Sequence, residues 1–393
     1  MSGFRLALVV SHPIQHFCPQ YVSFAQNKNM AFKVFFASTM GFKKYVDPTF
    51  KREIAWDNLN LDKFDHEFLN GDQLLEPDNK LDAPSIDNAL TAFNPDAVIC
   101  YGYFQPFQRR AYNWAKKHQK KIAYISDSMV LHDRSFVKEF LKRPFLKRYF
   151  SRVNYFLSVG DANETYYKKF GVTADKILRM HFPIDIISYE QAYQNRKELR
   201  ENIKRQFNIP SNELVLSMVG KIVAAKNQDQ LIDVLQILEK RGIYLHLLLI
   251  GTGDMQQEWE QKAKVLTKSK VHFTGFVNTT ALTAYYAATD IYVHSASIDR
   301  HSLAISEAIY MGCPAIISDR LGSFGPTDDV QDNKNGYVYQ FGNIQQLADK
   351  IEALVKDEKT REGFNKYSHE LGVQFQQKSH FQIIDKLITL VKG

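Results

Sequence analysis

The sequence predicts an α/β protein made of two Rossmann-like, doubly wound domains that face each other across a cleft. Its 393 residues are enough for two domains of roughly 150 residues or more, each with its own core. Short, continuously apolar runs alternate with longer amphipathic segments, which is typical of parallel sheets covered by helices on both faces. The alternation restarts after the polar stretch 190–213, so we expect the domain boundary there.

Ten apolar runs are the expected strands. In the first half they are 6–10, 32–38, 96–102, 121–126 and 155–160, and in the second half 214–220, 245–251, 271–276, 291–296 and 314–319. Helical patterns separate many of these runs. In residues 228–242, for example, the apolar residues fall mainly on one face and the pattern stops at Gly242.

We therefore expect an N-terminal domain over 1–190, a C-terminal domain over 191–375, and a last helix, 376–393, that packs back toward the first domain. Ligands of doubly wound sheets bind at the carboxyl ends of the strands. The expected binding site thus lies in the cleft, in the loops that follow the strands.

Composition narrows the class of protein. The net charge of +7 favours anionic partners such as sugar nucleotides, phosphates, nucleic acid or an anionic membrane surface. The three cysteines, Cys18, Cys100 and Cys313, are far apart, which argues against a disulfide framework or a structural zinc site. No apolar run approaches the roughly 18–20 residues that span a bilayer, and residues 5–11 resemble a buried strand more than a signal peptide. We expect a cytoplasmic protein.

The segment GTGDMQ (251–256) follows an expected strand and invites a dinucleotide-binding interpretation. Position 256 is Gln where the GxGxxG pattern has its third glycine. A tight strand-to-helix turn is therefore the favoured interpretation.

Two lysines follow the strand that ends at Gly220. Lys221 and Lys226 flank a loop just before an expected helix, where ammonium groups and backbone N–H groups together attract an anion. Two solvated surface lysines are the alternative, and the residues alone leave both open.

Asp299 and Glu307 are the two carboxylates of the stretch 295–320. Eight helical steps would separate them by about 12 Å, more than the roughly 5–9.5 Å between the carboxylates of glycosidases. A hydrolytic pair is therefore disfavoured. With Asp299 in a loop and Glu307 inside a helix that begins near Ser302, the two acids can hold the two ends of one extended ligand. Free N–H groups near Ser302 would then bind an anion between them.

These residues carry a resemblance to a known family. Asp299-x7-Glu307, followed by Gly312 and Pro314, resembles the Glu-x7-Glu signature of family-4 retaining glycosyltransferases of the GT-B fold, the bacterial glycosyl transferases group 1. Lys221 and Lys226 resemble the family's Arg/Lys pair that binds the donor diphosphate. Further similar segments are 317–326, 333–339, 157–177 and 182–185, and, for one bacterial branch, 11–25, 56–69 and 126–128.

The sequence departs from the family pattern in two places. Asp299 stands where the family usually has Glu and reaches one methylene less far, which leaves the donor sugar open. Lys221 stands where the family usually has Arg, and a Lys neutralises a diphosphate without forming the planar, bidentate fork of Arg.

The resemblance implies a metal-independent hexosyltransferase without cofactor, in which a nucleotide sugar, most often a UDP-sugar, is bound by the C-terminal domain and reacts with retention of configuration. It implies that Glu307 binds the ribose, that Asp299 holds the sugar, and that the lysines stabilise the leaving diphosphate. The implied donor-binding residues are Gly220, Lys221, Lys226, Gly251, Phe276, Val277, Asp299, His301, Ser302, Leu303 and Glu307. The implied catalytic residues are Asp127, Lys226, Asp299 and Glu307.

The N-terminal domain should bind the acceptor, a glycan, a lipid-linked sugar or a small molecule. Candidate acceptor-binding residues are His12, Gln15, Tyr103 and His132. His12 and Gln15 follow the first strand, although His12 is also compatible with a structural turn and His132 with a surface helix. Asp127 follows the run 121–126 and is the candidate general base or sugar-orienting residue.

Two charged segments have competing interpretations. Residues 136–152 hold six Lys or Arg and one Glu among aromatics, which suits either peripheral binding to an anionic membrane or a solvated helix packed by its apolar stripe. Residues 327–330, TDDV, are expected to be solvated loop charges, and no metal-binding DxD motif follows a strand. No nucleic-acid recognition motif is present.

Two other functions fit the same fold. One is a GT-B phosphorylase or sugar-nucleotide epimerase. The other is a non-catalytic, nucleotide-sugar-binding partner in a glycan-assembly complex.

Overall fold

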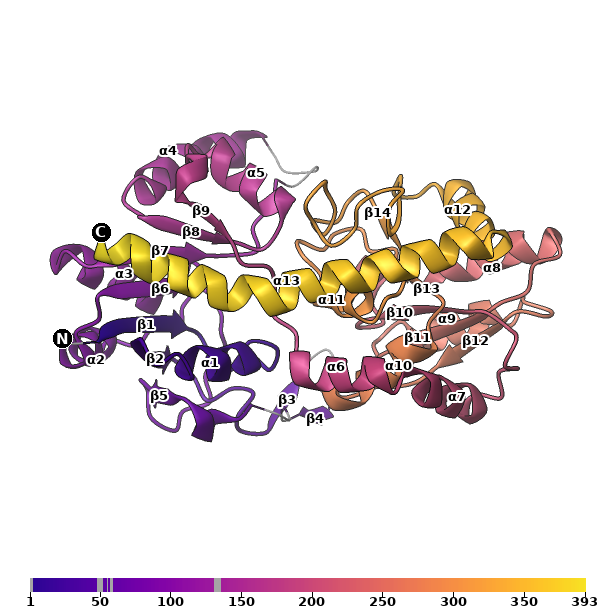
Figure 1. The fold of residues 1–393 in the computed structure, drawn as a ribbon, viewed down its shortest axis with the longest axis horizontal. Coiled ribbons are helices and arrows are strands. Elements are labelled where there is room, and N and C mark those ends of the chain that lie inside the picture. The colour runs from indigo at the N-terminus through magenta and orange to yellow at the C-terminus, as the bar shows by residue number, and fades with distance from the viewer. Residues whose placement is uncertain (1–2, 48–51, 55, 57–58, 131–135) are drawn as a thin grey trace.

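The computed structural model describes residues 3–47, 52–54, 56, 59–130 and 136–393. They form two parallel sheets, one of seven strands and one of six, each flanked by helices (Figure 1). A separate antiparallel pair, β3 (Tyr45–Asp47) and β4 (Arg52–Ile54), completes the strands.

The N-terminal sheet has the strand order β5-β2-β1-β6-β7-β8-β9. Its strands are β1 (Phe4–Val10), β2 (Met30–Phe36), β5 (Asp65–Phe68), β6 (Ala97–Tyr101), β7 (Lys121–Ile125), β8 (Tyr155–Ser158) and β9 (Ile177–Arg179). The helices of this half are α1 (Cys18–Ala25), α2 (Ile86–Phe93), α3 (Pro106–Lys117), α4 (Phe136–Phe150) and α5 (Asp161–Lys169), with short 3-10 turns η1 (Leu61–Lys63) and η2 (Ala174–Lys176).

The C-terminal sheet has the strand order β12-β11-β10-β13-β14-β15. Its strands are β10 (Val215–Val219), β11 (His246–Ile250), β12 (Lys270–Phe273), β13 (Ile291–His294), β14 (Ala315–Ser318) and β15 (Gly336–Tyr339). The helices here are α7 (Arg196–Gln206), α8 (Asp229–Lys240), α9 (Gln256–Ala263), α10 (Thr279–Ala288), α11 (Leu303–Tyr310) and α12 (Ile344–Lys356), with the 3-10 turn η3 (Ala224–Lys226).

All ten predicted strands are present, because a run that is apolar at every position is buried on both faces of a parallel sheet. In β11, for instance, every residue is buried. The helix predicted over 228–242 is α8, and it ends before Gly242, which has the positive φ of 76° that a helix C-terminus needs.

Three strands of the two main sheets were missed, and all three lie at a sheet edge: β5, β9 and β15. Edge strands are only partly covered, so their sequences need no continuous apolar run. β5 reads DHEF and none of its residues is fully buried.

The chain crosses between the sheets before helix α6 (Ile186–Gln194). Phe182 packs in the N-terminal core, whereas Ile184 and Tyr189 pack in the C-terminal core. The boundary expected at 190/191 therefore falls inside a helix, and the polar stretch 190–213 is mostly helical, with Ile203 of α7 packed against α10.

The last helix, α13 (Glu358–Lys392), starts earlier than the expected 376 and runs along both halves of the molecule (yellow in Figure 1). Phe364 near its start packs in the C-terminal core, and Ile384 and Leu387 near its end pack in the N-terminal core. Asn27 Nδ2 of the N-terminal half donates to Asp385 Oδ1 of the helix at 2.9 Å. One helix thus ties the two halves together.

Within the described parts of the chain, no helix combines the length and the apolar character needed to span a bilayer. Cys18, Cys100 and Cys313 are buried and free.

Candidate active site

The strand order of the C-terminal sheet reverses between β10 and β13, and ligands of doubly wound sheets bind at such a switch point. Lys221 and Lys226 follow β10, and Asp299 follows β13. Lys226 Nζ donates to Asp299 Oδ2 at 2.7 Å. Two residues that are 73 positions apart thus meet where the fold predicts a ligand.

The loop that carries Lys226 and the loop that carries Asp299 are joined by hydrogen bonds. Ser295 Oγ donates to the carbonyl oxygens of Lys226 and Asn227, and the N–H of Ser297 donates to the carbonyl oxygen of Ala225. The buried hydroxyl of Ser295 therefore fixes the turn η3 against the loop after β13. These hydrogen bonds restrict the backbone of Lys226 and so hold the base of its side chain at a fixed place.

Asp299 is charged in this environment. Burial raises the pKa of Asp299, but the hydrogen bond from His294 and the charge of Lys226 outweigh burial and hold the pKa well below its usual range. His294 Nε2 lies 3.2 Å from Asp299 Oδ2, the same oxygen that Lys226 contacts.

Glu307 lies inside α11 and is only 4% exposed. Tyr286 OH donates to Glu307 Oε2 at 2.8 Å, and the hydroxyl of Tyr189 of α6 is close enough to influence the same carboxylate. Burial raises the pKa of Glu307 to about 7, and the two tyrosines offset part of that rise. Glu307 is thus poised between its acid and its carboxylate form near neutral pH.

The N–H of Ser302 is engaged, contrary to the expectation of a free group. It donates to Ser323 Oγ at 2.9 Å, because the loop 321–323 packs against the loop after β13. The first-turn N–H groups of α11 belong to Leu303 and Ala304, and N–H groups in the first turn of a helix have no partner within that helix. An anion site at this point would therefore use Leu303 and Ala304.

The acids of TDDV are buried, so the expectation that residues 327–330 are solvated loop charges is wrong. Asp328 and Asp329 surround His301, with Asp329 Oδ2 3.2 Å from His301 Nε2. Burial lowers the pKa of His301, but the two carboxylates outweigh burial and raise the pKa to about 9. His301 is thus a buried cation, paired by charges that the sequence pattern does not connect to it.

The ligand atoms of His301, Asp328 and Asp329 lie within 4.8 Å of one another, a spacing compatible with a metal ion. The carboxylates are already occupied: Asp328 Oδ2 accepts from the N–H of Asp161, and Asp329 Oδ2 accepts from Ser306 Oγ. An internal charge cluster accounts for these contacts without a metal.

The same cluster joins the two halves of the molecule. The N–H of Asp161, at the start of α5, donates to Asp328 Oδ2 at 2.6 Å, and Thr327 donates back to the carboxylate of Asp161 through its N–H and its hydroxyl. A Cβ at Gly160 would lie 2.4 Å from Asp328 Oδ2, so the close approach requires glycine at this position. Loops at the carboxyl edges of the two sheets are therefore in direct contact.

Asp127 follows β7 and lies on the facing edge of the N-terminal sheet. Its Oδ1 is 3.9 Å from Nη1 of Arg300, the residue next to Asp299. The structure thus brings the candidate base close to the loop that carries the candidate donor-binding acid.

His12 and Gln15 lie after β1, the neighbour of β6 at the switch point of the N-terminal sheet. His12 Nδ1 is 2.8 Å from Ser11 Oγ, and burial lowers the pKa of His12 to about 4. His16, which sequence reasoning did not select, has its pKa lowered to about 4 by burial and by His12. Both imidazoles are neutral at pH 7 and can accept or donate a hydrogen bond.

Tyr103 follows β6 but packs beneath α4. Its ring centroid lies 5.9 Å from that of Phe145 and 5.6 Å from that of Tyr149. Tyr103 is therefore part of an aromatic cluster with Phe145 and Tyr149, and its role in acceptor binding stays a prediction. His132 lies outside the described residues.

The two glycines expected at the donor site have a packing role. Gly220 and Gly251 have φ of 153° and 140°, and a Cβ at Gly251 would lie 2.1 Å from the carbonyl oxygen of Gly220. GTGDMQ forms the tight turn between β11 and α9. Phe276 and Val277 lie between β12 and α10, at the same edge of the sheet as Asp299.

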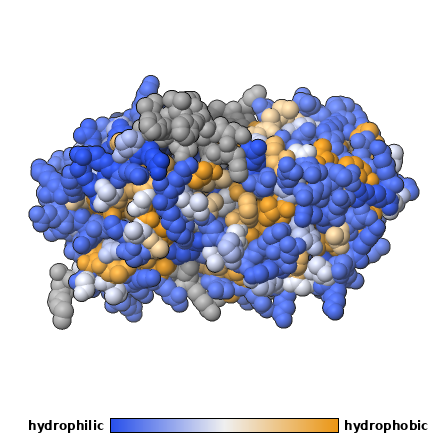
Figure 2. Space-filling model, turned by 90° about the horizontal axis from the view of Figure 1, so that it is seen from above, coloured by the Kyte–Doolittle hydropathy of each residue, from blue (hydrophilic) through white to orange (hydrophobic). Residues whose placement is uncertain are grey.

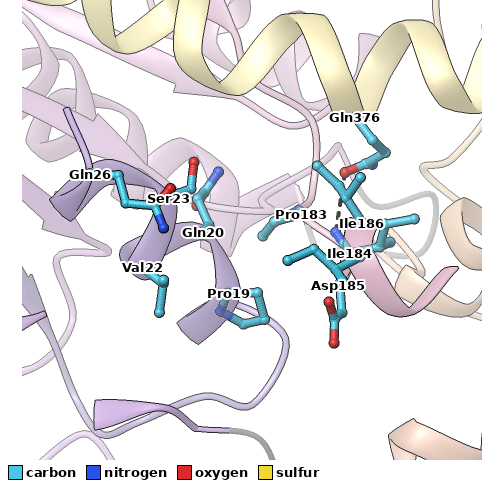
Figure 3. Close-up of a pocket in the computed structure, with 11 residues that line it drawn as sticks. Pro19, Gln20, Val22, Ser23, Gln26, Pro183, Ile184, Asp185, Ile186 and Gln376 are labelled. Atoms are coloured by element: carbon cyan, nitrogen blue, oxygen red, sulfur yellow. Dashed lines mark hydrogen bonds between the residues drawn. The ribbon is translucent and has the colours of Figure 1, made fainter. Parts of the chain in front are cut away.

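A separate groove of about 280 Å³ lies between α1 and the segment 183–187 (Figure 3). Gln376 of α13 lines it and accepts a hydrogen bond from the N–H of Ile184. None of the site residues selected from the sequence lines this groove.

The fold and the site define a class: two facing, doubly wound domains with a Lys–Asp pair and a buried Glu at the switch point of the second. Residues 199–371 match the family of glycosyl transferases group 1, in agreement with the group 1 resemblance expected from the sequence. This match spans the whole C-terminal sheet and includes Lys221, Lys226, Asp299 and Glu307.

Curated relatives match parts of the chain. The chain is 25% identical over 193 residues to the poly(ribitol-phosphate) alpha-N-acetylglucosaminyltransferase of Staphylococcus aureus, covering 48% of this chain and 36% of the relative. It is 22% identical over 267 residues to spore coat protein SA of Bacillus subtilis, covering 65% and 70%. The chain thus spans only about a third of the length of the staphylococcal relative.

A crystal structure of HepE from Anabaena in complex with UDP superposes with a TM-score of 0.71 at 17% identity, over 98% of this chain and 99% of that one. The fold is therefore GT-B, as predicted.

Proposed function

We propose that the protein is a retaining glycosyltransferase that moves a sugar from a nucleotide sugar, UDP-linked, to a glycan, lipid-linked or small-molecule acceptor. The contact between Lys226 and Asp299 at the switch point of a glycosyl transferases group 1 domain carries the proposal. The UDP complex of HepE supports the choice of nucleotide. The staphylococcal relative, named for poly(ribitol-phosphate), supports a glycan acceptor.

In this proposal the donor lies along the edge of the C-terminal sheet. Glu307 accepts hydrogen bonds from the ribose hydroxyls, and Asp299 holds hydroxyls of the sugar. Lys226, Lys221 and the N–H groups at the start of α11 stabilise the negative charge that grows on the diphosphate as the glycosidic bond breaks. Fixed donors aimed at developing charge lower the barrier, by on the order of 3 kcal/mol for each one. The lysines thus supply the charge that a metal ion provides in other transferases.

The acceptor lies on the N-terminal side. Asp127, held close to Arg300, orients the acceptor or the donor sugar, and the neutral imidazole of His12 offers the acceptor a hydrogen-bonding group. The leaving phosphate takes part in removing the acceptor proton, which is the route to retention. No residue in this scheme requires a metal or a cofactor.

UDP should raise the thermal unfolding temperature by several degrees when it is present at about 100 times its Kd, because binding to the folded state alone then adds roughly 2.7 kcal/mol. Differential scanning fluorimetry with UDP, GDP, ADP and uridine measures the effect. Uridine is the matched control, since it lacks the diphosphate that Lys226 contacts in our scheme. Absence of stabilisation by every nucleotide and nucleotide sugar would contradict the proposal.

Helix α4 supports a second part of the proposal, peripheral binding to an anionic membrane. Its described part exposes Arg143, Lys147 and Arg148 together with Phe145, which is 49% exposed. Figure 2 looks onto the side of the molecule where α4 lies. Clustered basic residues beside an exposed aromatic ring suit the surface of an anionic bilayer.

We expect the protein to sediment with vesicles of phosphatidylcholine and phosphatidylglycerol, and to be released by 0.5 M salt because the attraction is electrostatic. The double change Lys147→Glu/Arg148→Glu should abolish binding. Lys116→Glu/Lys117→Glu, the same charge change at exposed positions of α3, is the control and should keep most of it. Equal loss in both variants would show that net charge, and not this helix, governs binding.

A further inference from the structure

Strand β13 ends in a buried histidine that has no part in the scheme above. His294 is 1% exposed. Its Nε2 lies 3.2 Å from Asp299 Oδ2, and its Nδ1 lies 3.1 Å from the hydroxyl oxygen of Tyr292. Tyr292 is two residues earlier on the same strand, so both side chains lie on one face of the sheet.

The chemistry of the partners determines where the proton of the imidazole lies. Asp299 is ionised and can only accept a hydrogen bond, so Nε2 must carry the hydrogen. Burial lowers the pKa of His294, which keeps the ring neutral, and Nδ1 is then an acceptor for the hydroxyl of Tyr292. The bonds therefore run in one direction, from Tyr292 to His294 to Asp299.

Both protein donors to Asp299 use the same oxygen. Lys226 Nζ and His294 Nε2 both approach Oδ2. Among the described residues, no side chain donates to Oδ1 of Asp299. A short aspartate has two side-chain torsions, and two donors on one oxygen fix both. The other oxygen, Oδ1, is left for a ligand.

We infer that His294 is a positioning residue that holds Asp299 so that its Oδ1 meets the donor sugar while its Oδ2 pairs with Lys226. This inference rests on the proposed function. In this inference, His294 at the end of β13 fixes the orientation of the Asp299 carboxylate. Without His294, only Lys226 holds the carboxylate, which is then free to turn away from the sugar.

The inference predicts that a change at His294 lowers the rate of sugar transfer and leaves the affinity for the nucleotide unchanged. His294→Leu should lower kcat for transfer about 100-fold, the order of loss that follows a misplacement of about 1 Å. The Kd for UDP should stay within about threefold, because the contacts to the ribose and diphosphate are unchanged. His294→Gln should recover kcat to within about fivefold of the natural protein, because its amide N–H can replace Nε2–H.

A double-mutant cycle separates positioning from general stability. If His294 acts through Asp299, His294→Leu has no further effect on kcat in an Asp299→Asn background. The matched control is His246→Leu, which removes another buried sheet histidine, one bonded to Glu213 and away from the switch point. His246→Leu should lower the unfolding temperature without changing kcat.

The ring itself offers a readout that needs no donor. In ¹⁵N NMR spectra of the unliganded protein, His294 should be the neutral Nε2–H tautomer at pH 7, and Asp299→Asn should shift its signals. This measurement decides the inference even if the leucine variant does not fold or no nucleotide sugar is turned over, the latter being a failure of the proposed function alone. A charged ring, an Nδ1–H tautomer, an unchanged kcat in His294→Leu, or no recovery by Gln would each overturn the inference.

Discussion

We expect Lys226→Ala to abolish sugar transfer and to leave the fold intact. Lys226 is the cation that the structure places against Asp299 at the switch point, and the proposed reaction builds negative charge on the diphosphate at this place. Loss of one preorganised donor costs about 10²–10³ in kcat, and the simultaneous release of Asp299 from its partner adds to the loss. Transfer assayed with the preferred nucleotide sugar, alongside circular dichroism, measures both parts of the prediction.

Lys240→Ala is the matched control for this variant. Lys240 is exposed at the end of α8, the helix that follows the loop of Lys226. It should keep full activity, since it removes the same charge from the same domain away from the site. A Lys226→Ala protein with natural kcat and natural affinity for UDP would remove Lys226 from the mechanism.

Glu307→Gln should make the protein more stable at pH 8 while lowering transfer. Burial raises the pKa of Glu307 to about 7 from an ordinary value of 4.5. The folded state therefore holds this proton more tightly than the unfolded chain does. The resulting stability is fully present below pH 4.5 and is lost as the pH rises through 7. Above that, the natural protein carries a buried charge that costs on the order of 3 kcal/mol, which the amide of Gln avoids.

Urea unfolding at pH 5 and pH 8 tests the sign. The two proteins should have similar free energies of unfolding at pH 5, and the Gln variant should have the higher value at pH 8. Glu362→Gln, at an exposed position of α13, is the control and should show no such dependence. A Gln variant that is less stable at pH 8 would show that Glu307 is stabilised as a carboxylate by groups other than Tyr286 and Tyr189.

Much of the fold was predictable because it depends on local pattern. Ten strands and α8 follow from apolar runs and periodicity, and so does the position of Lys226 and Asp299 in loops after strands. The direct contact of Lys226 with Asp299 was not predicted, because it depends on the order of the strands in the sheet. The edge strand β5 was not predictable in this way, since a partly exposed strand needs no apolar run. The crossing near Phe182 was also not predictable from composition, because the polar stretch 190–213 resembles a linker although its helices pack on the C-terminal sheet.

The remainder of the site depends on tertiary contacts. Asp328 and Asp329 resemble solvated loop acids until the fold brings His301 and the N–H of Asp161 onto them. The role of His294 depends on Asp299 folding back over the end of its own strand, which no spacing rule indicates. The N–H of Ser302 was expected to be free because its partner, Ser323, lies 21 residues further on. The partners of Asp328, Asp329 and Ser302 are distant in the sequence, whereas His294 and Asp299 are close in the sequence and meet through the bend of the loop after β13.

A crystal structure of the protein with UDP or a UDP-sugar tests the central claim most directly. The account predicts the diphosphate against Lys226 and the start of α11, the ribose hydroxyls on Glu307 and, with a sugar present, its hydroxyls on Asp299 Oδ1. A nucleotide found elsewhere, such as in the groove between α1 and residues 183–187, with Lys226 and Asp299 still paired only to each other, would contradict it.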